Sequence, residues 1–146
     1  MTGMLSEEHQ KWLTARGLDL ETATRYGLFT DRQSPGGRDL VIPYRRNGKI
    51  INHKYRGPQK RFRQDPGAPR SLWNEDALRD ATLASEILLI TEGELDALAA
   101  IQAGFPRTVS VCDGAGSNLD VIGDLWDLVK DAGHVRKRLR SRAAVQ

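Results

Sequence analysis

The amino-acid sequence predicts an α/β fold in which a parallel β-α-β-α sheet follows a small region of helices and a β-hairpin. Three observations support this prediction. Ile87–Ile90 is a short, unbroken apolar run, typical of a strand buried on both faces of a parallel sheet. A helical segment at Glu94–Ala103 and a second strand at Thr108–Val111 follow in the order of a right-handed parallel unit. Upstream, Asn47-Gly48 between two extended segments is a strong hairpin signal.

Two short helices are predicted before the hairpin. Ser6 followed by two glutamates favours a helix start, and Gly17 favours its end. Asp19–Tyr26 fits a second helix, which Gly27 ends. Ser34–Gly37 has the composition of a loop.

The hairpin is predicted to have strands at Asp39–Tyr44 and Lys49–Tyr55, with a further extended piece around Phe62. Asn74 is a suitable N-cap for a short helix that reaches Leu78.

Three further features are predicted after the first parallel strand: a helix end, a loop and a second helix. Gly104 ends the helix after the first parallel strand. Asp113–Gly116 is predicted to be a loop, and its glycines favour a turn over a phosphate-binding loop. Ser117 or Asn118 is expected to cap a helix that reaches about Lys130.

Length and composition exclude several classes of protein. The 146 residues suffice for one domain, or for a small module joined to a domain-sized piece. Cys112 is the single cysteine, which excludes a disulfide framework and a cysteine-rich zinc site. The first residues show no apolar leader, and the longest apolar run is too short to span a bilayer. We expect a soluble, cytoplasmic protein with no membrane partner.

The charges are laid out in blocks. Residues 38–70 hold ten Lys and Arg against two acids, residues 81–131 hold nine acids against two cations, and residues 134–146 hold five cations and no acid. This layout suits a protein that meets phosphates on one face and gathers carboxylates on another. For any single residue, an ordinary solvated surface charge remains the alternative.

Carboxylates are predicted at the ends of the two parallel strands. Glu92 and Asp113 each follow a strand, and Asp96 falls in the first turn of the helix. Sites in open parallel sheets form beyond the carboxyl ends of the strands, and clustered carboxylates suit Mg²⁺. Gly93 would let the backbone turn sharply and a ligand approach closely. The alternative is that Glu92 and Glu94 only stabilise the helix N-terminus, with Asp96 in solvent.

The motif ITEGELDALAA followed by VSVCDGAGS resembles the first half of a Toprim domain, which primases, topoisomerases and some nucleases share. LTARGL, IPYRRNGKIINHKYR, KRF and LWN precede it in the order found in the phage-type primase–helicase family. The resemblance covers about residues 13–131. It implies a primase-like N-terminal region at 1–80 and a partial Toprim domain at 81–132. Residues 133–146 are basic and have no apolar run, so we expect either foreign coding after a truncation or a disordered basic tail.

The resemblance also implies roles for individual residues. Glu92 matches the Toprim glutamate, a general acid or base in metal-dependent phosphoryl transfer, and Asp96 matches the aspartate of the same motif. The implied magnesium ligands are Glu92, Asp96 and Asp113. The basic positions expected to contact template or nucleotide are Lys54, Arg56, Lys60, Arg61 and Arg63. The alternative for these cations is an ordinary exposed ribbon with charged edges.

The sequence departs from the family pattern in three respects. A Toprim domain has a third strand that ends in a D-x-D metal motif, whereas here the chain reads GHVRKRLRSRAAVQ. The sheet is therefore predicted to lack that strand, and the protein to be truncated before it. No cysteine pairs and no G-x-x-x-x-G-K-[ST] occur, so the zinc module and the helicase motor of the family are absent from this sequence.

Two functional hypotheses follow. The first is a Toprim-containing, DNA primase-like enzyme that joins nucleotides on single-stranded DNA with Mg²⁺, with a replicative helicase or other replication proteins as partners. The second is a non-catalytic nucleic-acid-binding module, or an accessory to a replication protein. A remnant gene product with little function is a third, simpler possibility.

Overall fold

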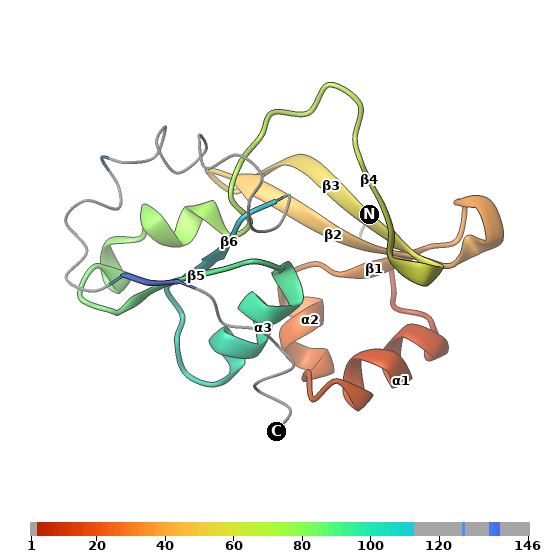
Figure 1. The fold of residues 1–146 in the computed structure, drawn as a ribbon, viewed down its shortest axis with the longest axis horizontal. Coiled ribbons are helices and arrows are strands. Elements are labelled where there is room, and N and C mark those ends of the chain that lie inside the picture. Colours follow the sequence, from red (N-terminus) through yellow and green to blue (C-terminus); the bar gives the residue numbers. More distant parts are fainter. Residues whose placement is uncertain (1–2, 113–126, 128–134, 138–146) are drawn as a thin grey trace. The chain divides into compact units, whose positions relative to one another are not determined.

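The computed structural model describes residues 3–112, 127 and 135–137 (Figure 1). The chain divides into two compact units. Unit 1 comprises Met1–Tyr44 and Lys49–Pro69, and unit 2 comprises Arg45–Gly48 and Arg70–Gln146. Within the described ranges, no helix combines the length and the apolar character that a membrane span needs.

The two helices of unit 1 begin and end where the sequence predicts. In α1 (Glu7–Ala15), the Ser6 hydroxyl accepts a hydrogen bond from the His9 N–H at 3.1 Å, which satisfies one of the donors at the helix start. Gly17 follows with a φ of 80°, a left-handed conformation that glycine adopts without strain. In α2 (Leu20–Arg25), Gly27 follows in the same way, with a φ of 87°.

The sheet of unit 1 has the strand order β1-β2-β3-β4. Its strands are β1 (Phe29–Asp31), β2 (Asp39–Arg46), β3 (Lys49–Gly57) and β4 (Arg61–Gln64). β1 pairs antiparallel with β2, and β4 pairs antiparallel with β3. β1 was not predicted, because three residues are too few to show the alternation of a strand. β2 is almost wholly buried, with Leu40, Val41 and Ile42 each at most 2% exposed.

The hairpin between β2 and β3 has the predicted two-residue turn. Asn47 and Gly48 both have positive φ, 53° and 79°, as a turn that matches the twist of its strands requires. The Asp76 carboxylate accepts the N–H of Asn47 at 2.7 Å and that of Gly48 at 2.9 Å. This turn is therefore held by the 3₁₀ helix Glu75–Leu78 of unit 2.

Unit 2 contains the predicted parallel sheet, with the strand order β6-β5-β7. β5 (Leu88–Thr91) is joined to β6 (Thr108–Ser110) through α3 (Glu94–Gln102), and the two strands pair in parallel. Buried apolar side chains pack into one core here: Leu72, Leu78, Leu88, Ile90 and Val109.

The prediction that this sheet would lack a third strand is wrong. Val135–Lys137 forms β7, which pairs in parallel with β5 on the side away from β6. The run is too short and too basic to be recognised as a strand, and its pairing partner is more than forty residues away. The sequence after β7 still contains no carboxylate. The disorder predicted for 133–146 is therefore wrong for Val135–Lys137, and the other residues of that tail lie outside the described residues. The loop at Asp113–Gly116 and, apart from Asp127, the following helix also lie outside them.

The role predicted for Asn74 is also wrong. Glu75–Leu78 is helical, but its side-chain cap is absent: Asn74 has a left-handed φ of 62° and makes no side-chain cap bond. Its amide instead donates to the Thr108 carbonyl at 2.9 Å. Asn74 thus ties the segment before the sheet to β6, a long-range contact that the local sequence does not reveal.

Candidate functional site

The predicted binding cations lie on the basic ribbon, which we define as β3, β4 and their connecting turn, residues 49–64 of unit 1. In the register of this ribbon, Lys54 lies opposite Gln64 and Arg56 opposite Phe62. Side chains alternate between the two faces of a strand. Lys54, Arg56 and Phe62 therefore share one face, and Arg63 lies on the other. The five predicted cations do not form one uniform surface.

On the first face, cations pair with aromatic rings. The Lys54 ammonium lies 5.1 Å from the centre of the Phe62 ring, and the Arg56 guanidinium lies 5.3 Å from it. Lys54 is only 9% exposed. The burial of Lys54 therefore does not fit the alternative in which these cations lie on an ordinary exposed ribbon.

Lys60 and Arg61 form the exposed tip of the ribbon. The turn Pro58–Lys60 places Gln59 and Lys60 at φ of 62° and 58°, a strained conformation for residues other than glycine. Within the described residues, neither the Lys60 nor the Arg61 side chain makes a hydrogen bond, ion pair or ring contact. These two cations are available to solvent and to a ligand.

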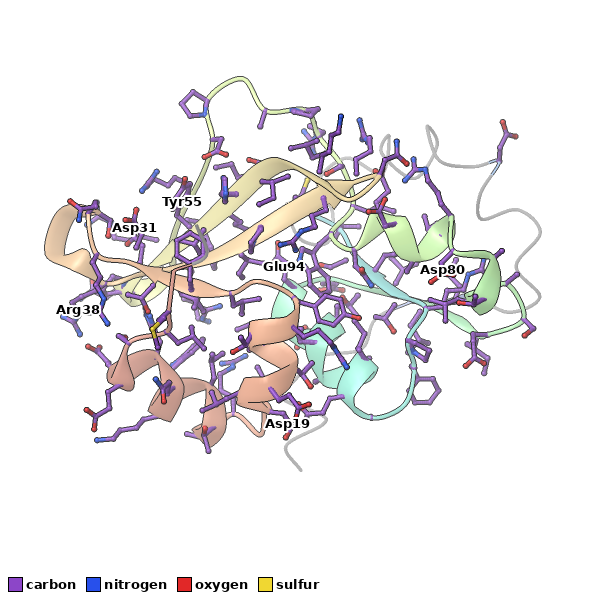
Figure 2. All side chains as sticks on the ribbon, turned by 180° about the vertical axis from the view of Figure 1, so that it is seen from behind. Asp19, Asp31, Arg38, Tyr55, Asp80 and Glu94 are labelled. Atoms are coloured by element: carbon purple, nitrogen blue, oxygen red, sulfur yellow. The ribbon has the colours of Figure 1, made fainter. Side chains whose placement is uncertain are left out.

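Arg63 is engaged within the protein. Its guanidinium lies 3.4 Å from the Asp39 carboxylate, 3.8 Å from that of Asp31 and 3.7 Å from the centre of the Tyr55 ring (Figure 2 labels Asp31 and Tyr55). Two carboxylates thus largely offset its charge. Because Asp31 is far from Arg63 in sequence, the motif alone does not show that Arg63 is ion-paired whereas Arg61, among the described residues, is not.

A polar network holds the end of the ribbon. The Asp65 carboxylate bonds His53 Nδ1 at 2.6 Å and accepts from the Tyr55 hydroxyl at 2.8 Å. Burial raises the pKa of Asp65, but the hydrogen bonds from His53 and Tyr55 outweigh it and hold that pKa below its usual value. Burial and the bond to Asp65 raise the pKa of Tyr55. His53 is therefore a structural residue of the ribbon.

A cavity of about 310 Å³ lies between α1 and the ribbon turn, within unit 1. Trp12, Arg56 and Lys60 contribute to its lining, together with the ion pair of Arg38 and Glu8, whose atoms lie 2.6 Å apart. Sequence reasoning singled out neither Trp12 nor Arg38 for this site. An aromatic residue in a predicted helix ordinarily belongs to the apolar side of that helix, so the sequence does not mark Trp12 as a site residue.

The acidic strand end, which we define as Glu92, Glu94 and Asp96, begins α3 in unit 2. The Thr91 hydroxyl donates to the Gly93 carbonyl at 2.8 Å and holds the backbone between β5 and α3. Glu94 is 5% exposed, whereas Glu92 and Asp96 are half-buried. Figure 2 labels Glu94. The alternative in which Asp96 stands in open solvent therefore does not hold.

Gly93 does not have the conformational role predicted for it. Its φ and ψ of −147° and 152° are extended values that any residue adopts. A Cβ at this position would lie 3.5 Å from Asp96 Oδ2, an ordinary contact. The other role predicted for Gly93, to let a ligand approach closely, stays a prediction.

The metal prediction is partly outside the described residues. Asp113 is not among them, and within the described part no three His, Cys, Asp or Glu side chains gather closely enough to hold a metal ion. Glu92 and Asp96 supply hard carboxylate oxygens from the same strand end, a donor chemistry that fits Mg²⁺. The assignment of catalytic, binding and metal residues stays a prediction.

The chain matches no family model. It is similar to two curated proteins of Arabidopsis thaliana. The identity is 35% over 113 residues to the Twinkle homolog protein, chloroplastic/mitochondrial, and 34% over 113 residues to the Primase homolog protein, in both cases over 76% of this chain. The chain spans 15% and 32% of the length of these relatives.

Three solved structures share the fold. The Aquifex aeolicus primase, with its zinc-binding and RNA polymerase domains, has a TM-score of 0.73 at 15% identity, over 96% of this chain and 45% of its own. The primase fragment of the bacteriophage T7 primase–helicase has 0.70 at 23%, over 90% and 56%. The DnaG primase catalytic domain bound to single-stranded DNA has 0.63 at 18%, over 90% and 52%. The predicted α/β fold is therefore confirmed, and these primase structures share it.

Proposed function

We propose that the chain is the catalytic-core part of a DNA primase-like protein of the phage-type primase–helicase lineage, which binds single-stranded DNA and nucleotides in DNA replication. The observation that carries this proposal is the presence, in one chain with the fold of primase structures, of an exposed cationic ribbon tip and of Glu92 directly after a parallel strand. The ribbon supplies contacts for phosphates, and the strand end supplies carboxylates.

In this proposal the ribbon and the acidic strand end have different roles. Lys60 and Arg61 bind the phosphates of template or incoming nucleotide, since their charges are exposed. Glu92 acts as general base toward the 3′-hydroxyl that attacks the α-phosphorus of the next nucleotide, with pyrophosphate leaving. Glu92 and Asp96, with Asp113, would hold Mg²⁺, which neutralises charge on the transferring phosphoryl group.

A second candidate is a non-catalytic nucleic-acid-binding module. The observation that favours it comes from the sequence. The sequence contains the complete basic ribbon, but it contains no D-x-D motif, from which a Toprim domain takes much of its metal binding. Partners such as a replicative helicase or other replication proteins suit both candidates.

A primer-synthesis assay with single-stranded template, nucleoside triphosphates and Mg²⁺ separates the two. We expect product from the unchanged chain, and a fall of about 100-fold or more with Glu92→Gln, since the loss of a general base typically costs ~10²–10⁴-fold. Glu86→Gln, an exposed glutamate before β5, is the matched control and leaves product unchanged. Binding of template without product at any metal concentration would contradict the enzyme and favour the binding module.

A further inference from the structure

Unit 1 contains a continuous row of alternating cations and aromatic rings, which we call the cation–aromatic row. The row runs from the Lys54 ammonium to the Phe62 ring at 5.1 Å, and from that ring to the Arg56 guanidinium at 5.3 Å. Arg56 lies 4.8 Å from the Trp12 ring, and Arg16 lies 4.8 Å from the same ring. The row links β4 and β3 to α1, elements that are far apart in sequence.

Phe62 is the exposed ring of this row. It is 50% exposed and stands on β4, the last strand in the order of its sheet. A phenylalanine at half exposure forgoes much of the free energy that burial of its ring would give. Its neighbours Arg61 and Arg63 are cations too, so Phe62 is an apolar ring set among positive charges.

A ring flanked by cations is the arrangement by which proteins hold unpaired bases. Bases of a single strand stack on aromatic rings and on guanidinium planes, while nearby cations follow the phosphates. The cavity lined by Trp12, Arg56 and Lys60 adjoins the row. At about 310 Å³ it is at the small end of the range for ligand pockets, ~300–1,000 Å³, which suits one nucleotide better than a longer segment.

We propose that the cation–aromatic row is a stacking platform for the bases of a single-stranded nucleic acid, with Phe62 as its exposed ring and the Trp12 cavity as the place of one further nucleotide. Lys60 and Arg61 hold the adjacent phosphates. This inference rests on the proposed function, because it takes the single strand as the ligand. It adds two aromatic residues, Phe62 and Trp12, to a site for which only cations were predicted.

A purely structural row is the competing explanation. Exposed cation–π contacts contribute to stability by themselves. In that case the loss of the Phe62 ring lowers stability but leaves the affinity for nucleic acid unchanged. Removal of the base from the ligand therefore separates the two explanations, because an abasic strand keeps its phosphates and offers nothing to stack.

The experiment measures fluorescence anisotropy of two labelled single strands of about 12 nucleotides, a length within the usual site sizes. One is oligothymidine and the other is an abasic strand of the same length. The proteins are the full chain, Phe62→Ala, Phe62→Leu, Phe62→Tyr and the control Phe105→Ala. Phe105 is 39% exposed in the loop between α3 and β6 of unit 2, outside the row. Phe62→Leu keeps an apolar side chain and removes only the ring.

We expect Phe62→Ala and Phe62→Leu to weaken oligothymidine binding by about 10-fold, as the loss of one base stack does. Phe62→Tyr keeps a ring and its affinity, and Phe105→Ala has no effect. None of the variants changes binding of the abasic strand. Equal affinities of the chain and Phe62→Leu for oligothymidine, or equal losses on both strands, would overturn the inference while the proposed function stands. Failure of the unchanged chain to bind either strand would overturn the proposed function itself.

Discussion

At the scale of single residues, a buried carboxylate organises the segment before the parallel sheet. The Glu75 side chain is fully buried and accepts bonds from Arg46 Nε at 2.8 Å, Arg46 Nη2 at 3.2 Å and Arg79 Nη1 at 2.8 Å. The hydrogen bond that Arg46 donates to Glu75 raises the pKa of Arg46. Two cations are thus held by one charge. The loss of that charge removes the hydrogen-bonded partner of Arg46 and leaves Arg79 with the Asp76 carboxylate at 3.8 Å.

We therefore predict that Glu75→Ala lowers the free energy of unfolding by about 2 kcal/mol, as the loss of hydrogen bonds to a charged group does. Glu86→Ala, at an exposed glutamate in the same unit, changes it by less than ~0.5 kcal/mol. Chemical denaturation of the two variants measures both values. Equal small effects would mean that Glu75 is not a central residue of unit 2.

Asp65 gives the ribbon a defined response to pH. Its pKa is lower in the folded state than the ordinary value of 3.8, so the unfolded chain takes up the proton first as pH falls. The stability that Asp65 contributes is complete above that ordinary value and is lost as pH falls through the lower, folded-state pKa. We expect Asp65→Asn to remove this part of the acid sensitivity. Thermal unfolding of both proteins between neutral pH and pH ~2 measures it, and parallel curves would contradict the role of Asp65.

At the scale of elements, the turn between β3 and β4 is strained. Gln59 and Lys60 both have positive φ, which costs ~1–2 kcal/mol for a residue with a Cβ. Such strain persists where the surrounding structure holds it, and here it presents Lys60 at the ribbon tip. The strain is thus part of how the proposed binding surface is built.

Glycine at the turn relieves that strain. We predict that Gln59→Gly raises the free energy of unfolding by up to ~1 kcal/mol and that Gln59→Val lowers it, because a β-branched residue resists left-handed φ. Denaturant titration of the two variants compares them directly. A destabilised Gln59→Gly would show that this backbone conformation is not adopted in solution.

The elements also show what the sequence alone reveals. Local signals predict α1, α2, the Asn47-Gly48 turn and the β5-α3-β6 unit, because caps, glycines and apolar runs act within a few residues. β7 and the Asn74 contact depend on partners far along the chain, and local patterns do not contain them. The same distinction between local and long-range signals applies to the candidate site. The motif identifies the cations of the ribbon, but the ion pairs of Arg63 and the ring contacts of Phe62 and Trp12 follow from the folded structure.

At the scale of the whole molecule, the block layout of charge predicts a salt-dependent interaction with a single strand. Each phosphate contact contributes ~0.7 to the slope of log affinity against log salt. Because Lys60 and Arg61 are exposed whereas Arg63 is paired, we expect Lys60→Ala with Arg61→Ala to lower the slope by about 1.4, and Arg63→Ala to lower it by less. Binding of a single strand across a salt series measures this. Equal slopes for the chain and the double variant would contradict the ribbon as the contact surface.

The proposed function requires that the carboxylates after β5 hold a divalent ion close to a single strand that the chain binds. Iron(II) in place of Mg²⁺ tests it most directly, because with peroxide it releases hydroxyl radicals that cut nucleic acid close to the ion. We predict cuts confined to a few nucleotides of a bound oligonucleotide, lost in Glu92→Gln with Asp96→Asn although the oligonucleotide stays bound. A bound strand that stays uncut, or that is cut equally in the double variant, would contradict the claim.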